Sequence, residues 1–329
     1  MSTHVAQPFV LELADPAATD LATTGGKGSS LARLAAAGLP VPGGFHVTTD
    51  AYRAAVRGAP QHVIVEAAGL VDPGRPETYE AAAARIAQVF AELEIPGAVA
   101  DAVRAGHSRL HPAGTGALAV RSSATAEDLP GMSFAGQQDS YLNIRGEEAL
   151  LRAVRDCWSS LWTARAIGYR ARHGIPADGV ALAVVVQDLV DADAAGVLFT
   201  VDPMTGSRDS VLINAAWGLG AAVVSGQVTP DTFLVARLGG AVGTTISTKD
   251  VRTVRSEDGT RNEPVPAELR ELPSLTDAQA ADLAALGTRI EELYEVAVDV
   301  EWAVRDGRSF VLQARAVTGA AGRQPVPEV

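Results

Sequence analysis

The chain has 329 residues, enough for a large hydrophobic core and about two domains. Its formal net charge of −12 argues against binding to nucleic acid, because such binders need a basic surface that displaces counterions. The single cysteine, Cys157, cannot form an internal disulfide, and no window is apolar for long enough to span a bilayer. The composition therefore favours a cytoplasmic protein without a membrane segment.

The first chemical signal along the chain is a glycine-rich segment, Gly25 to Ser30, followed by a helical pattern from Leu31. It places Lys27 between glycines near the start of a helix, where backbone N–H groups favour anions. The segment is not a Walker loop, because Gly28 stands where that motif needs Ser or Thr after the lysine. Taken alone, it is also compatible with a flexible turn.

A mostly helical region from Gly58 to Gly116 precedes the second signal, the stretch from Leu118 to Ile144. Two strand-like segments flank a polar middle, and Arg121 leads into a row of small hydroxyl residues. We expect this guanidinium and these hydroxyls to contact phosphate. Gly136, in the following turn, would let backbone amides approach a polyphosphate. An ordinary polar hairpin is the alternative.

The next segment, from Glu147 to Ala171, predicts one long amphipathic helix, in which Cys157 and its tryptophan neighbours are expected to be buried. The continuous apolar run from Val180 to Val190 predicts a central strand buried on both faces. At the end of that strand, Gln187 can contact an adenine edge.

The C-terminal part contains a polar segment, residues 252–274, that we expect to be a surface loop, and then a helix to Tyr294 that begins at a Thr/Asp cap. An Asp-Gly turn after Val304 predicts a hairpin. Its two-residue period puts carboxylates, an amide and a guanidinium on one surface, namely Asp299, Glu301, Gln313 and Arg315. Such oxygens suit Mg²⁺ shared with phosphates, and the guanidinium suits a developing phosphoryl charge. A salt bridge between Glu301 and Arg315 is the alternative.

Taken in order, these segments resemble the ATP-binding domain shared by phosphoenolpyruvate synthase, pyruvate phosphate dikinase and rifampin phosphotransferase. The resemblance is carried by GGKGSSL, GLPVPGGFHVTT, VRSSATAEDLPGMSFAGQQDSYLNI, DCWSSLWTARAIGYR, WGLGAAVVSGQVTPDTF and VEWAV with FVLQAR. AVVVQDLVDADAAGVLFT is most similar to the rifampin phosphotransferase branch. The resemblance implies an α+β ATP-grasp fold, in which two subdomains with mostly antiparallel sheets grip nucleotide. We expect these subdomains at 1–188 and 189–318, with a disordered linker at 319–329.

The resemblance also implies roles for individual residues. Lys27 and Arg121 would contact phosphates, and Gly136 and Ser140 would belong to a covering loop. Gln187 would border the adenine. Glu301 and Gln313 would hold Mg²⁺, and Arg315 would stabilise phosphoryl transfer, so that Lys27, Arg121 and Arg315 form the catalytic set. In this family ATP phosphorylates a histidine on a separate swivelling domain, releasing AMP and phosphate, and that histidine then phosphorylates an antibiotic or a pyruvate-like acceptor.

The sequence departs from the family pattern at several positions. Ser140 replaces a usual threonine, and Asn214 and Ala221 stand where relatives often carry glutamate. None of the six histidines has the context of the phosphorylated one, so we expect the chain to rely on a phosphohistidine domain elsewhere in the full-length protein or in trans. A stand-alone ligase that forms an acyl phosphate and ADP is one alternative. A non-catalytic nucleotide-binding module is another, although the retained charged groups count against it.

Overall fold

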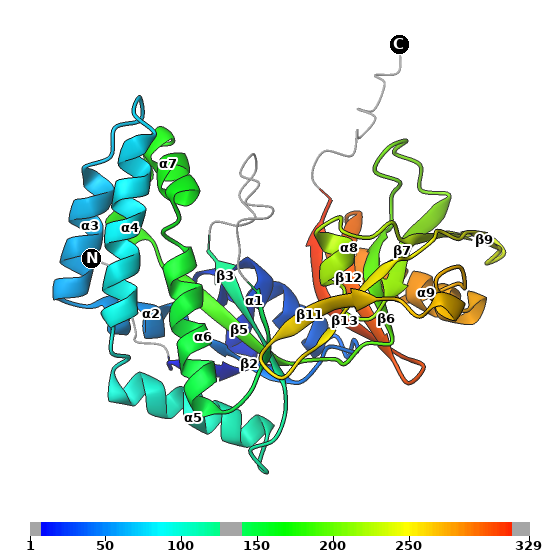
Figure 1. Ribbon diagram of the computed structural model, residues 1–329, viewed down its shortest axis with the longest axis horizontal. Coiled ribbons are helices and arrows are strands. Elements are labelled where there is room, and N and C mark those ends of the chain that lie inside the picture. Colours follow the sequence, from blue (N-terminus) through cyan, green and yellow to red (C-terminus); the bar gives the residue numbers. More distant parts are fainter. Residues whose placement is uncertain (1–7, 126–139, 318–329) are drawn as a thin grey trace. The chain divides into compact units, whose positions relative to one another are not determined.

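The computed structural model describes residues 8–125 and 140–317 and divides into two compact units (Figure 1). Unit 1 comprises Met1–Ala36 and Gly43–Leu189, and unit 2 comprises Ala37–Pro42 and Val190–Val329. Each unit combines helices with antiparallel sheet, so the predicted α+β class is confirmed. Gly136 and the expected linker at 319–329 lie outside the described residues. No helix in the described part of the chain is long and apolar enough to cross a membrane.

Unit 1 is built on a five-stranded sheet in which every neighbouring pair is antiparallel. Its order is β1-β2-β5-β3-β4, with β1 at Val10–Glu12, β2 at Gly44–Val47, β3 at Leu118–Ala124, β4 at Ser140–Ile144 and β5 at Leu182–Asp188. The prediction of a central buried strand is confirmed by β5, because it lies in the middle of the sheet and is buried from Leu182 to Gln187.

One face of this sheet carries the main core of unit 1. Val120, Val184 and Val186 point into it, and helices cover them. These helices are α2 (Thr49–Val56), α3 (Ala59–Gly69), α4 (Glu77–Glu92), α5 (Gly97–Leu110), α6 (Glu147–Ser160) and α7 (Ala164–Arg172). Cys157 and Trp158 are fully buried there, as the sequence predicted, and the thiol is therefore a packing group.

The prediction of one helix from Glu147 to Ala171 is wrong, because the chain forms two helices, α6 and α7. Thr163 has an extended backbone and caps the second helix, its Oγ1 accepting a hydrogen bond from Ala166 N at 3.3 Å. The apolar spacing continues across this break, so the periodicity alone does not reveal it. The break creates a corner between α6 and α7 on the core side of the sheet.

The other face of the unit 1 sheet is covered by α1 (Leu21–Ala36), while α6 lies on the core face (Figure 1). α1 contains one non-helical residue, Gly25, with φ +71° and ψ 177°. This residue divides the element, so that Lys27 lies at the start of the second helical part, as the sequence predicted. Leu11 of β1 packs against Ala32 of α1, which identifies the face that the helix covers.

Unit 2 is built on a six-stranded antiparallel sheet with the order β13-β12-β6-β7-β8-β9. The strands are β6 (Ala194–Phe199), β7 (Ser210–Trp217), β8 (Asp231–Ala236), β9 (Val242–Thr245), β12 (Val298–Arg305) and β13 (Arg308–Ala316). Helix α9 (Asp277–Tyr294) covers one face, where Gly287 lies against Leu198. The predicted cap is confirmed, because Thr276 and Gln279 form a reciprocal capping box.

The expectation of a surface loop at 252–274 is wrong for its first half, which forms a hairpin of β10 (Val251–Arg255) and β11 (Thr260–Pro264). The turn contains Asp258 and Gly259, with Gly259 at φ +101°. This is the same Asp-Gly signal that correctly predicted the β12–β13 hairpin. The polar composition of the flanking residues hid the strands, because both are only partly buried.

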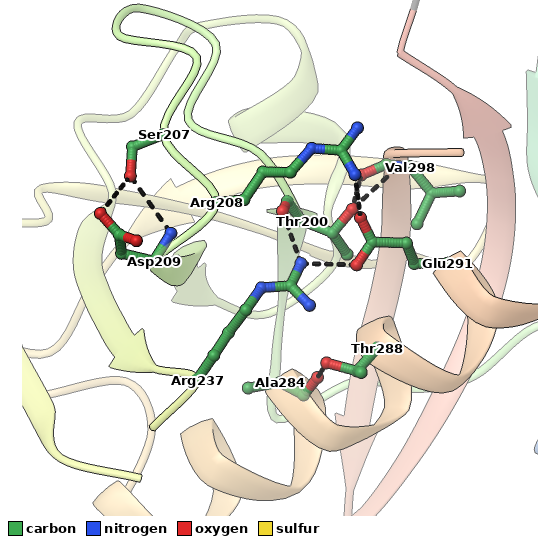
Figure 2. A network of polar contacts seen from close by, with 9 residues as sticks. All are labelled: Thr200, Ser207, Arg208, Asp209, Arg237, Ala284, Thr288, Glu291 and Val298. Atoms are coloured by element: carbon green, nitrogen blue, oxygen red, sulfur yellow. Dashed lines mark hydrogen bonds and ion pairs between the residues drawn. The ribbon is translucent and has the colours of Figure 1, made fainter. Parts of the chain in front are cut away.

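A polar network fastens α9 to the sheet of unit 2 (Figure 2). Glu291 of α9 accepts an ion-paired hydrogen bond from Arg237 at 2.5 Å, and Arg208 approaches it at 3.4 Å. Arg237 also donates to Thr200 O at 2.7 Å. Thr200 Oγ1 in turn accepts from Val298 N at 2.9 Å, so the network ends at the residue that begins β12.

Candidate functional site

Lys27 and Arg121 come from segments that pack directly on each other in unit 1. The backbone N–H of Gly28 donates to Ser123 Oγ at 3.0 Å, and Ser123 Oγ donates to Thr24 O at 2.7 Å. Gly25 lies so close to the Ser123 carbonyl that a side chain there would overlap it. The glycine-rich turn of α1 is thus fixed on β3, two residues from Arg121, and both predicted phosphate contacts belong to one rigid arrangement.

The register of the unit 1 sheet places three further groups relative to Arg121. Ser140 of β4 lies directly opposite Arg121. Gln187 of β5 lies opposite Ala119, which is two residues before Arg121 on β3. Residues directly opposite share a face, and so do residues two apart on one strand. Arg121, Ser140 and Gln187 therefore lie on the face that the glycine-rich turn of α1 covers.

Gln187 is deeply buried, at 2% exposure, and its Nε2 has no hydrogen-bond partner among the described residues. A buried amide donor of this kind is costly unless a partner satisfies it. A ligand with an acceptor atom, such as an adenine ring, would supply that partner. The predicted role of Gln187 beside a base therefore fits its surroundings.

The hydroxyls that follow Arg121 do not all lie on one face of the sheet, although the sequence predicts one row. Ser123 is engaged by the α1 turn through both of its hydrogen-bonding roles. Ser122 alternates to the opposite face and is buried at 1% exposure on the core side. Sequence reasoning missed the tethering role of Ser123, because only the tertiary contact with Gly28 reveals it.

His46 lies beneath the glycine-rich turn, on the same row of the sheet as Arg121. It is opposite Val185, which is itself opposite Arg121, and Gly28 packs over its ring. Burial lowers the pKa of His46 to about 4, with a hydrogen bond to Leu13 O and the charge of Asp15 opposing the shift. The imidazole is therefore neutral near pH 7 and adds no charge to the site.

In unit 2, the predicted metal ligands lie directly opposite each other. Glu301 of β12 pairs with Gln313 of β13, and Asp299 pairs with Arg315 two residues away. The pairing of β12 with β13 shifts register between Glu301 and Trp302, so Glu301 and Gln313 are the last pair before this irregularity. Glu301 and Gln313 are half-buried, and their carboxylate and amide lie on the face of the sheet opposite α9.

Arg315 is positioned by Asp299, which lies opposite it on β12. Arg315 donates from Nε and Nη2 to Asp299 Oδ2 at 2.9 and 2.7 Å. Burial raises the pKa of Asp299 and the charge of Glu301 adds to this, while Arg315 opposes it. Arg315 is thus ion-paired with Asp299, while the alternative of a salt bridge between Arg315 and Glu301 stays a prediction.

Asn214, the first position where we expect relatives to carry glutamate, lies on the same row of the sheet as the predicted metal ligands. Glu301 is opposite Val197, and Val197 is opposite Asn214, so Asn214 lies two strands from the carboxylate. It accepts a hydrogen bond from Thr232 Oγ1 at 3.2 Å. Ala221 is exposed at the start of α8 (Ala221–Val224). If relatives carry glutamate at the position of Asn214, as we expect from the sequence, this residue places a neutral amide where they have a carboxylate, on the surface that carries Glu301.

The donor set of this surface suits Mg²⁺ only as a shared ion. No group of three His, Cys, Asp or Glu side chains within residues 8–125 and 140–317 is arranged to hold a metal. Mg²⁺ keeps several waters and commonly takes one or two protein oxygens together with substrate phosphates. One carboxylate and one amide oxygen, from Glu301 and Gln313, fit that mode of binding.

Comparison with known proteins identifies the family. The model of the pyruvate phosphate dikinase, AMP/ATP-binding domain matches residues 21–328. A rifampicin phosphotransferase of Streptomyces sviceus is 43% identical over 99% of this chain, and a probable phosphoenolpyruvate synthase of Methanothermobacter thermautotrophicus is 42% identical over 91%. The chain spans 37% and 44% of the length of these two relatives.

A solved D-alanine–D-alanine ligase from Bacillus anthracis covers 94% of this chain and 60% of its own, at 10% identity with a TM-score of 0.35, a likeness that carries no argument. The two larger sheets, one in each unit, are antiparallel, as expected from the sequence. The sequence match is extensive and covers both units. This chain belongs to the pyruvate phosphate dikinase AMP/ATP-binding domain family.

Proposed function

We propose that this chain binds ATP with Mg²⁺ and is the nucleotide-binding part of a dikinase-type phosphotransferase. ATP, water and a histidine on a separate domain give AMP, phosphate and phosphohistidine, with water taking up the phosphoryl group that leaves as phosphate, and the phosphohistidine passes its phosphoryl group to a small acceptor. The names of the relatives, rifampicin phosphotransferase and probable phosphoenolpyruvate synthase, support this class. We infer one of two acceptor classes, an antibiotic, with resistance as the consequence, or a pyruvate-like acid.

The observation that carries this proposal is the docking of the α1 turn on β3. Two hydrogen bonds through Ser123 hold Lys27 and Arg121 in one framework. A lysine at the start of a helical segment and an arginine on an adjacent strand can each offer positive charge to an anion. Ser140 shares the face of Arg121 and offers a hydroxyl to the same anion. We therefore assign phosphate binding to Lys27, Arg121 and Ser140, and the adenine edge to Gln187.

Unit 2 supplies the remaining groups in this proposal. Glu301 and Gln313 would hold Mg²⁺, which, when bound, neutralises charge on the phosphate oxygens. Arg315 stabilises negative charge that develops during transfer, and Asp299 fixes the direction of its guanidinium. Because Asp299 is nearly buried, it holds the guanidinium of Arg315 in a defined orientation before ATP binds.

The test is calorimetric titration of Mg-ATP into the chain and into Arg121→Gln. Loss of a charge-assisted contact to phosphate weakens binding by about 10- to 100-fold. Arg85→Gln is the matched control, because Arg85 is a half-exposed arginine on α4 that pairs with Glu66. Equal affinity in Arg121→Gln and Arg85→Gln would overturn the assignment of the phosphate site.

The metal assignment has its own readout. Glu301→Gln should weaken ATP binding when Mg²⁺ is present and change it little in EDTA, because the carboxylate acts through the ion. Glu292→Gln, at an exposed position on α9, should change neither titration. If Glu301→Gln weakens binding equally with and without Mg²⁺, the carboxylate does not act through the metal.

A further inference from the structure

Unit 1 contains two neighbouring cavities on the core side of its sheet, at the corner between α6 and α7. The first has a volume of about 260 Å³ and is enclosed mainly by apolar side chains, among them Leu161, Ala166, Ile175 and Leu182. The second, of about 280 Å³, lies against Trp162 and Ile167. Arg170 of α7 lines both cavities.

Arg170 is a deeply buried cation, with 6% of its surface exposed. Its Nη2 donates to Leu161 O at 2.7 Å, and its guanidinium carbon lies 4.7 Å from the centre of the Trp162 ring. Burial lowers the pKa of Arg170 to about 10, a value that still leaves the side chain protonated near pH 7. The cavities are therefore apolar spaces with a permanent positive charge on their wall.

No carboxylate of the described residues forms an ion pair with this arginine. Asp178 lines the second cavity, but it is not among the groups that shift the pKa of Arg170. Proteins rarely bury a charge without a partner of opposite sign, because removing it from water is costly. The carbonyl of Leu161 and the ring of Trp162 compensate only part of that cost.

We propose that the first cavity is a binding site for a small organic carboxylate with an apolar body, whose carboxylate pairs with Arg170. A guanidinium matches a carboxylate through paired hydrogen bonds, and the pairing strengthens where water is excluded. One cation suits a singly charged ligand, because a doubly charged phosphate would bring an uncompensated charge into an apolar space. An engineered cavity of about 150 Å³ holds benzene, so a ligand the size of benzoate fits this volume.

This site is separate from the proposed phosphate site on β3 and does not rest on the proposed function. Ser122 and Ala124 line the cavity, whereas Arg121 and Ser123 alternate to the face under α1. The first cavity opens to solvent where the chain passes from α7 to β5, because Pro176 and Gly179 line this cavity and are exposed. A ligand can therefore enter without displacing the core of the unit.

The probe is benzoate, titrated calorimetrically into the chain near pH 7, with benzamide as its neutral counterpart of nearly equal shape. We expect benzoate to bind at least about tenfold more tightly than benzamide, because a hydrogen-bonded charge pair contributes this much or more. Added salt should weaken binding little, since buried charge pairs are poorly screened. Equal binding of the two compounds, or no benzoate binding, would overturn the proposal.

Two variants locate the site. Arg170→Gln should lower benzoate affinity by about tenfold or more. Gly179→Leu should abolish binding, because its side chain enters open space at the mouth, where a Cβ meets no atom within 4 Å. Gly97→Leu is the matched control, since Gly97 is exposed at the start of α5, has the same open surroundings and lines neither cavity.

The second variant keeps the proposal falsifiable if Arg170→Gln fails to fold. Gly179→Leu should keep the melting temperature and the Mg-ATP affinity of the parent chain, while Gly97→Leu keeps both of these and benzoate binding. If benzoate affinity survives in Gly179→Leu, the ligand does not occupy this cavity and the proposal is wrong. If Arg170 serves only to cap α6 and stack on Trp162, its loss lowers the melting temperature and benzoate never stabilises the parent chain.

Discussion

Alanine at Gly25 and at Gly38 tests the docking of the α1 turn, because both glycines have a positive φ but only Gly25 packs on β3. Both have φ +71°. A Cβ at Gly38 meets no atom within 4 Å, whereas a Cβ at Gly25 would overlap the carbonyl oxygen of Ser123. The pair therefore separates the cost of a positive φ from the cost of disturbing the contact with β3.

The magnitudes follow from these surroundings. Alanine at a positive φ costs about 1–2 kcal/mol of folding free energy, and the cost is at least as large at Gly25, whose ψ of 177° lies in a region that glycine alone populates readily. At Gly25 the overlap with a backbone atom adds about 1–3 kcal/mol, because Ser123 belongs to an internal strand and cannot move freely. We expect Gly38→Ala to lose about 1–2 kcal/mol and Gly25→Ala about 2–5 kcal/mol.

Urea denaturation measures these losses, and calorimetric titration measures Mg-ATP affinity in the same two variants. Gly25→Ala should also weaken ATP binding, because the turn that carries Lys27 must shift away from Arg121. Gly38→Ala should bind ATP like the parent chain. Equal losses of stability in the two variants, together with unchanged ATP affinity in Gly25→Ala, would refute the description of the turn as a fixed part of the phosphate site.

Two further predictions concern buried charge. His46 has a folded pKa of about 4 and an ordinary value of 6.5, so the unfolded chain takes up a proton first as the pH falls. Stability should then decrease by about 3 kcal/mol between these values, and urea titrations at stepped pH should show a flatter profile for His46→Gln than for the exposed control His62→Gln; identical profiles would contradict this. Asp231 accepts from the fully buried Lys249 at 2.6 Å, so Asp231→Asn should cost about 3–5 kcal/mol in urea denaturation, and a loss below about 1 kcal/mol would show that the pair is solvated.

Much of the fold could be predicted from local patterns, and the failures have local causes. The apolar run of β5 and the Asp-Gly turn between β12 and β13 each specify one structure. The corner at Thr163 was missed because the apolar spacing of α6 continues into α7. The β10–β11 hairpin was missed because its strands are polar and half-exposed, although its turn carries the same Asp-Gly signal.

The candidate site was predictable to the extent that it depends on strand alternation and turn chemistry. The face shared by Glu301 and Gln313 follows from the two-residue period and the position of the turn. The tether between Gly28 and Ser123 joins residues 95 positions apart, and no local pattern encodes it. The buried Arg170 was equally hidden, because an arginine in an amphipathic helix ordinarily lies at the surface.

The central claim is that this chain binds ATP for transfer to a histidine on another domain. The direct measurement is to mix the chain with ATP, Mg²⁺ and an isolated phosphohistidine domain from a rifampicin phosphotransferase, and to identify the nucleotide product and the phosphorylated residue. We predict AMP, phosphate and phosphohistidine, all dependent on Arg121. ADP without phosphohistidine would contradict the account and favour a ligase that forms an acyl phosphate.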